Sequence, residues 1–201
     1  FVVTYQNDQL TDLAGLEYTP TTQQTRTIAA DWPSLCRMTV ADTKIVCKTM
    51  SGVGSAHKWR VSAGGQRSDI NAALATSYAV PIISSFDSGA LALSTDGTVV
   101  ATVTGTNFGP VDATNTVQAQ YQNTALGGLA GSLFRAQSCT VKSDTQMDCL
   151  SAVGVGLEHK WVVTVGAQVS AQSTAYTSYR TPSVSSILMY DKLGQSEMFL
   201  G

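Results

Sequence analysis

Apolar and polar residues alternate with a period of two along much of this chain, in short runs that end at Gly, Pro, Asn, Asp or Ser. This pattern is typical of β-strands with one buried face. No segment carries an apolar stripe of helical period, so we expect an all-β protein. The strands predicted in the middle of the chain are residues 81–86, 98–105, 116–123, 132–137, 146–151, 159–168 and 173–179.

The sequence also repeats itself. Residues 51–68 read SGVGSAHKWRVSAGGQRS and residues 153–170 read VGVGLEHKWVVTVGAQVS, with 10 identities in 18 positions at an offset of 102 residues. Residues 76–86 match 177–187 at an offset of 101, and residues 5–15 match 121–131 at an offset of 116. The larger offset upstream places about 14 extra residues in the first copy, before Cys36. Repetition at this period predicts tandem domains.

The offsets set the expected domain boundaries. Residues 1–80 align with a domain that lacks the counterpart of residues 81–116, residues 81–181 form a complete copy, and residues 182–201 open a third. Seven short strands in about 100 residues predict an immunoglobulin-like β-sandwich for each copy. A copy without its first strands would expose an apolar face and an unpaired edge, so we expect the longer chain or a neighbouring molecule to complete it.

Each copy carries His-Lys-Trp behind a Gly-x-Gly turn. The alternation along the following strand places Trp59 and Trp161 inside, as core anchors between two sheets. The glycines predict positive φ angles, and a strand follows them rather than the helix that a phosphate loop requires. We interpret His57 and His159 as surface histidines at a strand edge, because equivalent points of separate domains cannot share a metal or a catalytic base. We therefore expect no catalytic residue, no metal and no cofactor.

The four cysteines fall into two pairs, and each pair flanks a polar turn. Of the three possible connectivities, we favour Cys36–Cys47 and Cys139–Cys149, because each turn would fold back as a hairpin and bring its own sulfurs together. Two pairs of buried thiols are the alternative, and a zinc site would need more ligands per domain. Disulfides would indicate an oxidising compartment and an extracellular or cell-surface location.

Composition narrows the choice of partners. Only 13% of the residues are charged, the net charge is −2, and no run of Lys or Arg occurs. The basic footprint that nucleic acid requires is therefore missing. No apolar run reaches the roughly 18 to 20 residues that span a bilayer, so we expect no membrane span in this segment.

Several motifs resemble the IPT/TIG family of immunoglobulin-like domains. VTGTNFG at 103–109 is similar to the second-strand signature of that family, and SDTQMDC, Gly154-x-Gly156, VVTVGAQVS and YRTPSVSSI are similar to the rest of the domain. The resemblance covers residues 81–181, the later two-thirds of residues 1–80, and residues 182–201 as the bare start of a repeat. The His-x-Trp variant most resembles tandem arrays in large secreted proteins of algae and protists, including flagellar-hair (mastigoneme) glycoproteins.

This resemblance implies a structural module of an extracellular filament or cell-surface array, with other copies of the protein or neighbouring domains as partners and the flagellar surface as one such location. The ligand-binding ectodomain of a receptor or adhesion protein is the alternative, and a carbohydrate-binding module is a third hypothesis. The insertion in the first copy, with Tyr18, Trp32 and Pro33, is predicted to make lateral contacts, since its aromatic residues have no place in the shared core. The resemblance also allows O-linked glycans near Thr19 or Thr181.

Overall fold

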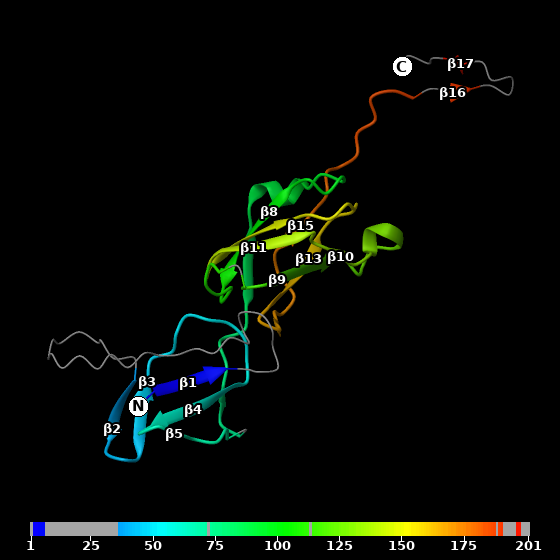
Figure 1. The fold of residues 1–201 in the computed structure, drawn as a ribbon. Coiled ribbons are helices and arrows are strands. Elements are labelled where there is room, and N and C mark those ends of the chain that lie inside the picture. The colour runs from blue at the N-terminus through cyan, green and yellow to red at the C-terminus, as the bar shows by residue number, and fades with distance from the viewer. Residues whose placement is uncertain are drawn as a thin grey trace.

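The computed structural model describes residues 2–6, 36–71, 73–112, 114–187, 189–190 and 196–197. In this part of the chain every pair of strands is antiparallel, and the helices are two short 3-10 segments (Figure 1). The predicted all-β class is confirmed. None of the helices in these ranges is long and apolar enough to cross a membrane.

The first repeat contributes two small sheets. One has the order β1-β4-β5, with β6 paired to β4, and the other is the hairpin β2-β3. The strands are β1 (Val2–Gln6), β2 (Cys36–Val40), β3 (Lys44–Cys47), β4 (His57–Ala63), β5 (Gln66–Arg67) and β6 (Ala75–Thr76).

The second repeat has two larger sheets, with the orders β10-β9-β13-β14, in which β15 also pairs with β13, and β11-β12-β8-β7. Its elements are β7 (Ile82–Phe86), η2 (Ser88–Ala92), β8 (Val100–Thr106), β9 (Val117–Gln122), η3 (Gly128–Gly131), β10 (Phe134–Arg135), β11 (Ser138–Ser143), β12 (Gln146–Leu150), β13 (His159–Val165), β14 (Gln168–Val169) and β15 (Tyr176–Thr177). A separate pair, β16 (Met189–Tyr190) and β17 (Ser196–Glu197), follows.

The two repeats share the same strand pairing wherever both are described. Tyr5 faces Trp59 across β1 and β4, and Tyr121 faces Trp161 across β9 and β13. The hairpins β2-β3 and β11-β12 also correspond, but β12 continues to pair with β8, whereas β3 has no such neighbour among the described strands. The sequence repeat is therefore a structural repeat. The two copies differ in that only the second has strands equivalent to β7 and β8 among the described residues.

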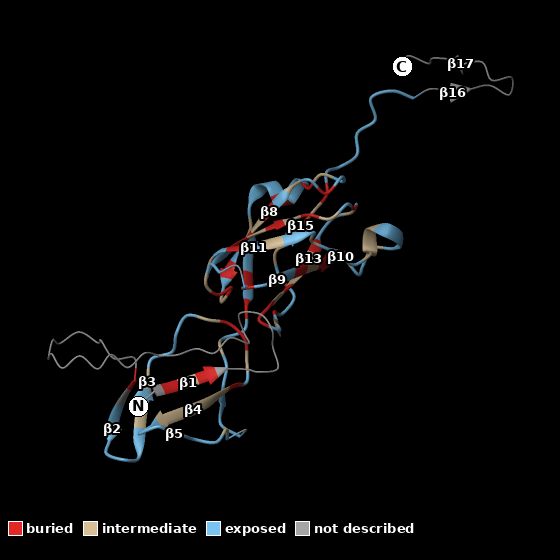
Figure 2. Ribbon diagram, viewed as in Figure 1, coloured by how far each residue is buried: buried red, intermediate tan, exposed pale blue. Residues whose placement is uncertain are grey.

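Both sheets of the second repeat contribute to one hydrophobic core. Along β13 buried residues alternate strictly with half-buried ones, because one face of the strand looks toward the other sheet. In β4, the counterpart of β13, only His57 is fully buried, and Trp59 and Val61 stay half-buried (Figure 2). The alternation predicts the inward face correctly, but a face becomes buried only where a second sheet covers it.

Three of the strands expected in the second repeat differ from the structure. The strand expected at 159–168 ends at Val165 and the chain turns back as β14, and the strand expected at 173–179 is reduced to β15. The strand expected at 132–137 is reduced to the two residues of β10, and a separate strand, β11, follows it as the first arm of the cysteine hairpin. Phe134 of β10 pairs with Tyr121 in one sheet, whereas Cys139 of β11 pairs with Cys149 in the other. The chain changes sheets at Gln137, whose Nε2 donates to the carbonyl oxygens of Gly97 and Ser151 at 2.7 and 2.6 Å. The change of sheet interrupts the period of two on which the prediction relied.

Candidate functional site: aromatic clusters and the interface between the repeats

A cluster of two tyrosines and a histidine occurs once in each repeat. In the second repeat the hydroxyls of Tyr121 and Tyr179 lie 2.8 Å apart, and the His159 ring is edge-on to both, with centroids 5.8 and 5.6 Å away. In the first repeat Tyr5 and Tyr78 have hydroxyls 2.9 Å apart and surround His57 in the same way. The chain therefore builds one internal arrangement twice.

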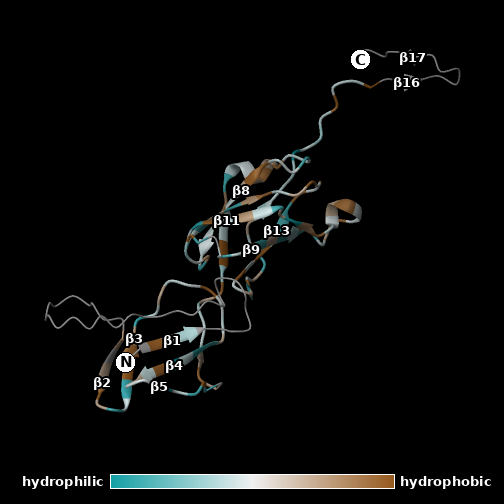
Figure 3. Cartoon of the chain, viewed as in Figure 1, coloured by the Kyte–Doolittle hydropathy of each residue, from teal (hydrophilic) through white to brown (hydrophobic). Residues whose placement is uncertain are grey.

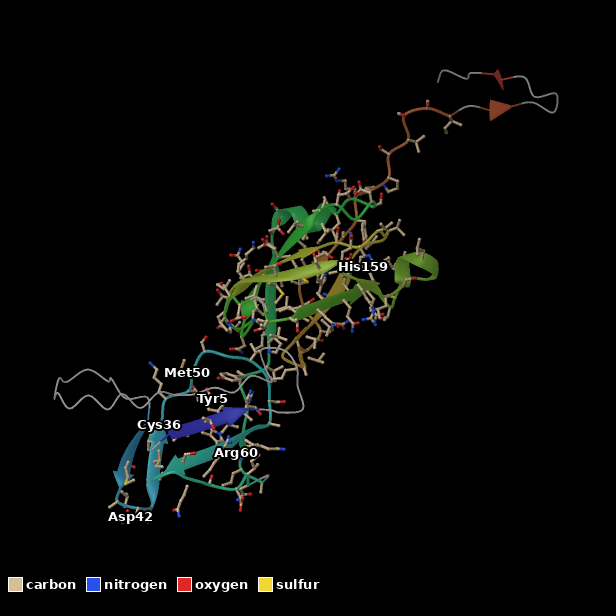
Figure 4. All side chains as sticks on the ribbon, in the orientation of Figure 1. Tyr5, Cys36, Asp42, Met50, Arg60 and His159 are labelled. Atoms are coloured by element: carbon tan, nitrogen blue, oxygen red, sulfur yellow. A yellow bond between two sulfur atoms is a disulfide. The ribbon has the colours of Figure 1, made fainter. Side chains whose placement is uncertain are left out.

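The tyrosine hydroxyls of each cluster are held by one backbone position. The Tyr121 hydroxyl accepts from the Ala152 amide at 2.8 Å, and the Tyr179 hydroxyl donates to the Ala152 carbonyl at 2.9 Å. Met50, which Figure 4 shows near Tyr5, has this role in the first repeat. Its amide donates to the Tyr5 hydroxyl and its carbonyl accepts from the Tyr78 hydroxyl, both at 2.8 Å. Burial raises the pKa of both Tyr121 and Tyr179, so these hydroxyls stay protonated. They can therefore hold the segments that carry them together by hydrogen bonds.

The Gly-x-Gly turns position the two histidines. Gly54 and Gly156 have φ angles of 97° and 107°, which confirms positive φ at the second glycine of each turn. The first glycines, Gly52 and Gly154, do not have positive φ, so for them the prediction is wrong. The carbonyls of these two glycines accept from the amides of Tyr78 and Tyr179, both at 2.9 Å. The turn thus connects the last strand of each repeat to the start of the His-Lys-Trp strand.

The interpretation of the histidines as surface residues is wrong. His57 and His159 are only 1% and 0% exposed. Each lies two residues before a tryptophan on the same strand, so period-two alternation places it on the same inward face as Trp59 or Trp161. The period of two along each strand therefore contains the signal for the burial of both histidines.

His159 is a neutral, buried imidazole. Its Nε2 lies 3.1 Å from the Val155 carbonyl oxygen, and Phe134 covers the ring at a centroid distance of 5.3 Å. Burial is the largest cause of a lowered pKa, since the hydrogen bonds to Val155 and Gly156 act in the opposite direction. A neutral imidazole that donates from Nε2 to the Val155 carbonyl fits this site.

We predict that His159 makes the stability of the second repeat depend on pH. Because the folded-state pKa lies below the ordinary 6.5, the unfolded chain binds more protons. The free energy of unfolding should therefore fall as the pH drops below about 6.5, by at most about 1.4 kcal/mol per pH unit. Denaturant titrations at several pH values should show a weaker dependence for His159→Gln. Parallel curves for the two proteins would contradict the prediction.

The two tryptophans differ in burial. Trp161 is 0% exposed, stacks on Tyr121 at 4.3 Å and donates from Nε1 to the Thr177 hydroxyl at 2.8 Å. Trp59 makes the matching contacts with Tyr5 at 4.3 Å and Thr76 at 2.9 Å, but remains half-buried. Trp161 is thus a core anchor, as predicted. Trp59 is only a partial one, because in the described residues nothing takes the place of Phe86, which lies 5.3 Å from the Trp161 ring.

The structure contains both favoured disulfides, Cys36–Cys47 and Cys139–Cys149. Each bridge joins residues that face each other across a hairpin, β2-β3 or β11-β12. A closed loop of this length stabilises the fold by roughly 2.5 to 3 kcal/mol on the chain-entropy model. The pairing leaves no free cysteine in the chain and is compatible with an extracellular protein.

The contact between the repeats is centred on Val53. This side chain is 3% exposed and belongs to the same buried cluster as the core of the second repeat. A Cβ atom on Gly109 would lie 2.1 Å from Val53 Cγ1, so a glycine here lets the Val53 side chain pack directly on the loop backbone, and the φ of +81° also favours glycine. Asn115 holds the loop in place by donating to the Phe108 and Pro110 carbonyls, both at 2.9 Å.

Two hydrogen bonds flank this contact. Gln168 Nε2 donates to the Tyr78 carbonyl at 3.0 Å, and Asn107 Nδ2 donates to the Val80 carbonyl at 2.9 Å. A small cavity of about 60 Å³ between these groups is lined by residues of both repeats. Apolar packing and two side-chain bonds therefore fix the linker between the repeats at a defined position.

The predicted lateral contact loop lies outside the described residues, and it includes Tyr18, Trp32 and Pro33. In the described ranges no group of three or more His, Cys, Asp or Glu side chains is placed to hold a metal ion. Comparisons with protein-family models, curated proteins and solved structures gave no match.

Proposed function

We propose that this chain is a structural module of an extracellular filament or cell-surface array, built from tandem immunoglobulin-like repeats of the IPT/TIG type. In this proposal residues 1–80, 81–181 and 182–201 belong to three consecutive repeats. The partners are neighbouring domains or other copies of the protein, and the module has no enzymatic role. The flagellar surface is one location that the motif resemblance suggests.

The observation that carries the proposal is the fixed contact between the repeats. A flexible linker would let two domains move independently, which suits a chain of separate binding modules. Here Val53 is buried against Gly109. The side chains of Gln168 and Asn107 donate to the carbonyls of Tyr78 and Val80, in the segment that links the two repeats. Such a contact holds successive domains at one angle, which is what a rod or filament requires.

The duplicated clusters support the same proposal. The only two histidines of the chain are buried in equivalent places, and the tyrosines around them bond to the backbone rather than to an open site. This arrangement stabilises strands in each repeat. The two equivalent disulfides suit a location outside the cell.

The contact can be tested with one substitution made at equivalent positions of the two repeats. Val53→Asp would bury an unpaired carboxylate at the contact, which costs several kcal/mol unless the contact opens. Small-angle scattering should therefore show one rigid particle for the unaltered chain and a broad range of distances between the repeats for Val53→Asp.

Val155→Asp is the matched control, because Val155 is the counterpart of Val53 and is 37% exposed. We expect it to leave the scattering curve of this chain unchanged. If the unaltered chain already scatters as two independently moving bodies, the proposed structural role is wrong.

A further inference from the structure

The same Gly-Val-Gly turn has different surroundings in the two repeats. Val53, in the first turn, is 3% exposed because the second repeat covers it. Val155, in the second turn, is 37% exposed. The backbone of the two turns is nearly the same, with φ angles of 97° at Gly54 and 107° at Gly156. The second turn therefore presents the shape that the first turn uses for its contact, but with nothing seated on it in the described residues.

Further apolar side chains surround Val155. Leu157 is 51% exposed, and Leu129 in the neighbouring helix η3 is 65% exposed. Gly156 lies against that helix, since a Cβ placed on it would be 3.1 Å from the Ala130 Cβ. Helix η3 is apolar in Figure 3 and not buried in Figure 2. An exposed apolar surface of this kind on an otherwise well-packed repeat indicates a contact site.

The backbone groups of the established contact also have counterparts here. Tyr78 and Val80, whose carbonyls accept from Gln168 and Asn107, correspond to Tyr179 and Thr181. Arg180 replaces Ala79, but its Nε donates to the Ala92 carbonyl at 3.2 Å, which ties the guanidinium to its own repeat near η2. The second repeat thus repeats the valine and both carbonyl positions of the first.

We propose that the Val155 turn, with Tyr179 and Thr181, is the docking site for one further domain of this same repeat type. That domain would place its counterpart of Gly109 over Val155 and its counterparts of Gln168 and Asn107 on the two carbonyls. The proposal rests on the proposed array function and adds to it the partner surface. It follows from the established contact, which joins the same two surfaces within this chain.

The test extends the chain by one repeat. A second copy of residues 81–181 is joined after Thr181 in place of residues 182–201, because Pro182 corresponds to Pro81. We expect amide hydrogen exchange at residues 155–157 to be slower by about tenfold or more in the extended chain than in the 201-residue chain. Scattering should show three repeats at fixed distances.

Val155→Asp should then abolish this protection and loosen the third repeat, although the same substitution leaves the 201-residue chain unchanged. Val153→Asp is the matched control, because Val153 corresponds to the exposed Ser51, and it should have little effect. Gly109→Val in the added copy should act like Val155→Asp, since its side chain would collide with Val155.

Equal exchange in the two chains, or equal effects of Val153→Asp and Val155→Asp, would overturn the docking site. Such a result would leave the proposed function standing as long as the Val53 contact remains rigid in the same scattering data. A flexible Val53 contact would instead contradict the proposed function itself. The two failures are therefore distinguishable.

Discussion

Joining a second copy of residues 81–116 in front of Phe1 is expected to bury Trp59 and to make the first repeat as resistant to proteolysis as the second. The first repeat has an open cavity of about 470 Å³, lined by Val3, Ile45, Val46, Cys47, Thr49, Trp59, Val61 and Thr76. In the second repeat β7 and β8 supply Phe86, Ala101 and Val103 to the corresponding region of the core. The added copy carries these same side chains.

The physical reason is that a partial β-domain buries less apolar surface against the same entropy of ordering its chain, so its folded state is less stable and opens to proteases more often than that of the complete repeat. In the 201-residue chain we therefore expect proteases to cleave residues 1–80 well before residues 81–181. In the extended chain both repeats should resist cleavage, and Trp59 fluorescence should shift to shorter wavelength as its ring leaves water.

A matched control carries Phe86→Asp in the added copy only, which places a carboxylate where an aromatic ring should pack against Trp59. This variant should behave like the chain without the extension. If residues 1–80 resist cleavage as strongly as 81–181 without any addition, the assignment of the first repeat as incomplete is wrong.

Trp161→Ala is expected to destabilise the second repeat by about 3–5 kcal/mol, the usual cost of removing a fully buried aromatic side chain. The substitution removes the stacking on Tyr121 and leaves the Thr177 hydroxyl without its indole donor. Thr177 is itself 0% exposed, so water cannot easily replace that donor. The loss is large compared with the total stability of a domain of this size.

Trp59→Ala provides the comparison within the same molecule. Trp59 has the same partners, Tyr5 and Thr76, but its ring is half-buried and borders the open cavity. Its removal should cost less than half as much, since little new empty space is created. Hydrogen exchange followed by mass spectrometry reads the two repeats separately. Equal losses in both would show that the tryptophans have equal packing.

The features that the sequence predicted well are local and repeated. The cysteine pairs flank short turns, so hairpin formation alone brings Cys36 to Cys47 and Cys139 to Cys149. The period-two pattern predicts that Trp161 points inward, and the prediction is correct because a complete second sheet covers that face of β13.

The features that the sequence did not predict depend on distant parts of the chain. The partial exposure of Trp59 follows from missing partner strands, and the two strands β10 and β11 follow from a change of sheet at Gln137. The burial of Val53 requires a glycine loop of the other repeat, which no pattern within residues 51–68 can show. Contacts of this kind become visible only once the repeats are placed side by side.

The contact at Val53 also gives the molecule a direction. The second repeat contacts Val53 with the loop that contains Asn107 and Gly109. Its own valine, Val155, lies on a different turn. The Gly156 carbonyl of that turn accepts from the Tyr179 amide, just before the chain continues to residues 180–187. A contact between two unlike surfaces is head-to-tail and does not close on itself after two copies. Successive repeats joined in this way would point the same way, so the two ends of the row would differ chemically. Within one chain, the length of the row would be set by the number of repeats encoded.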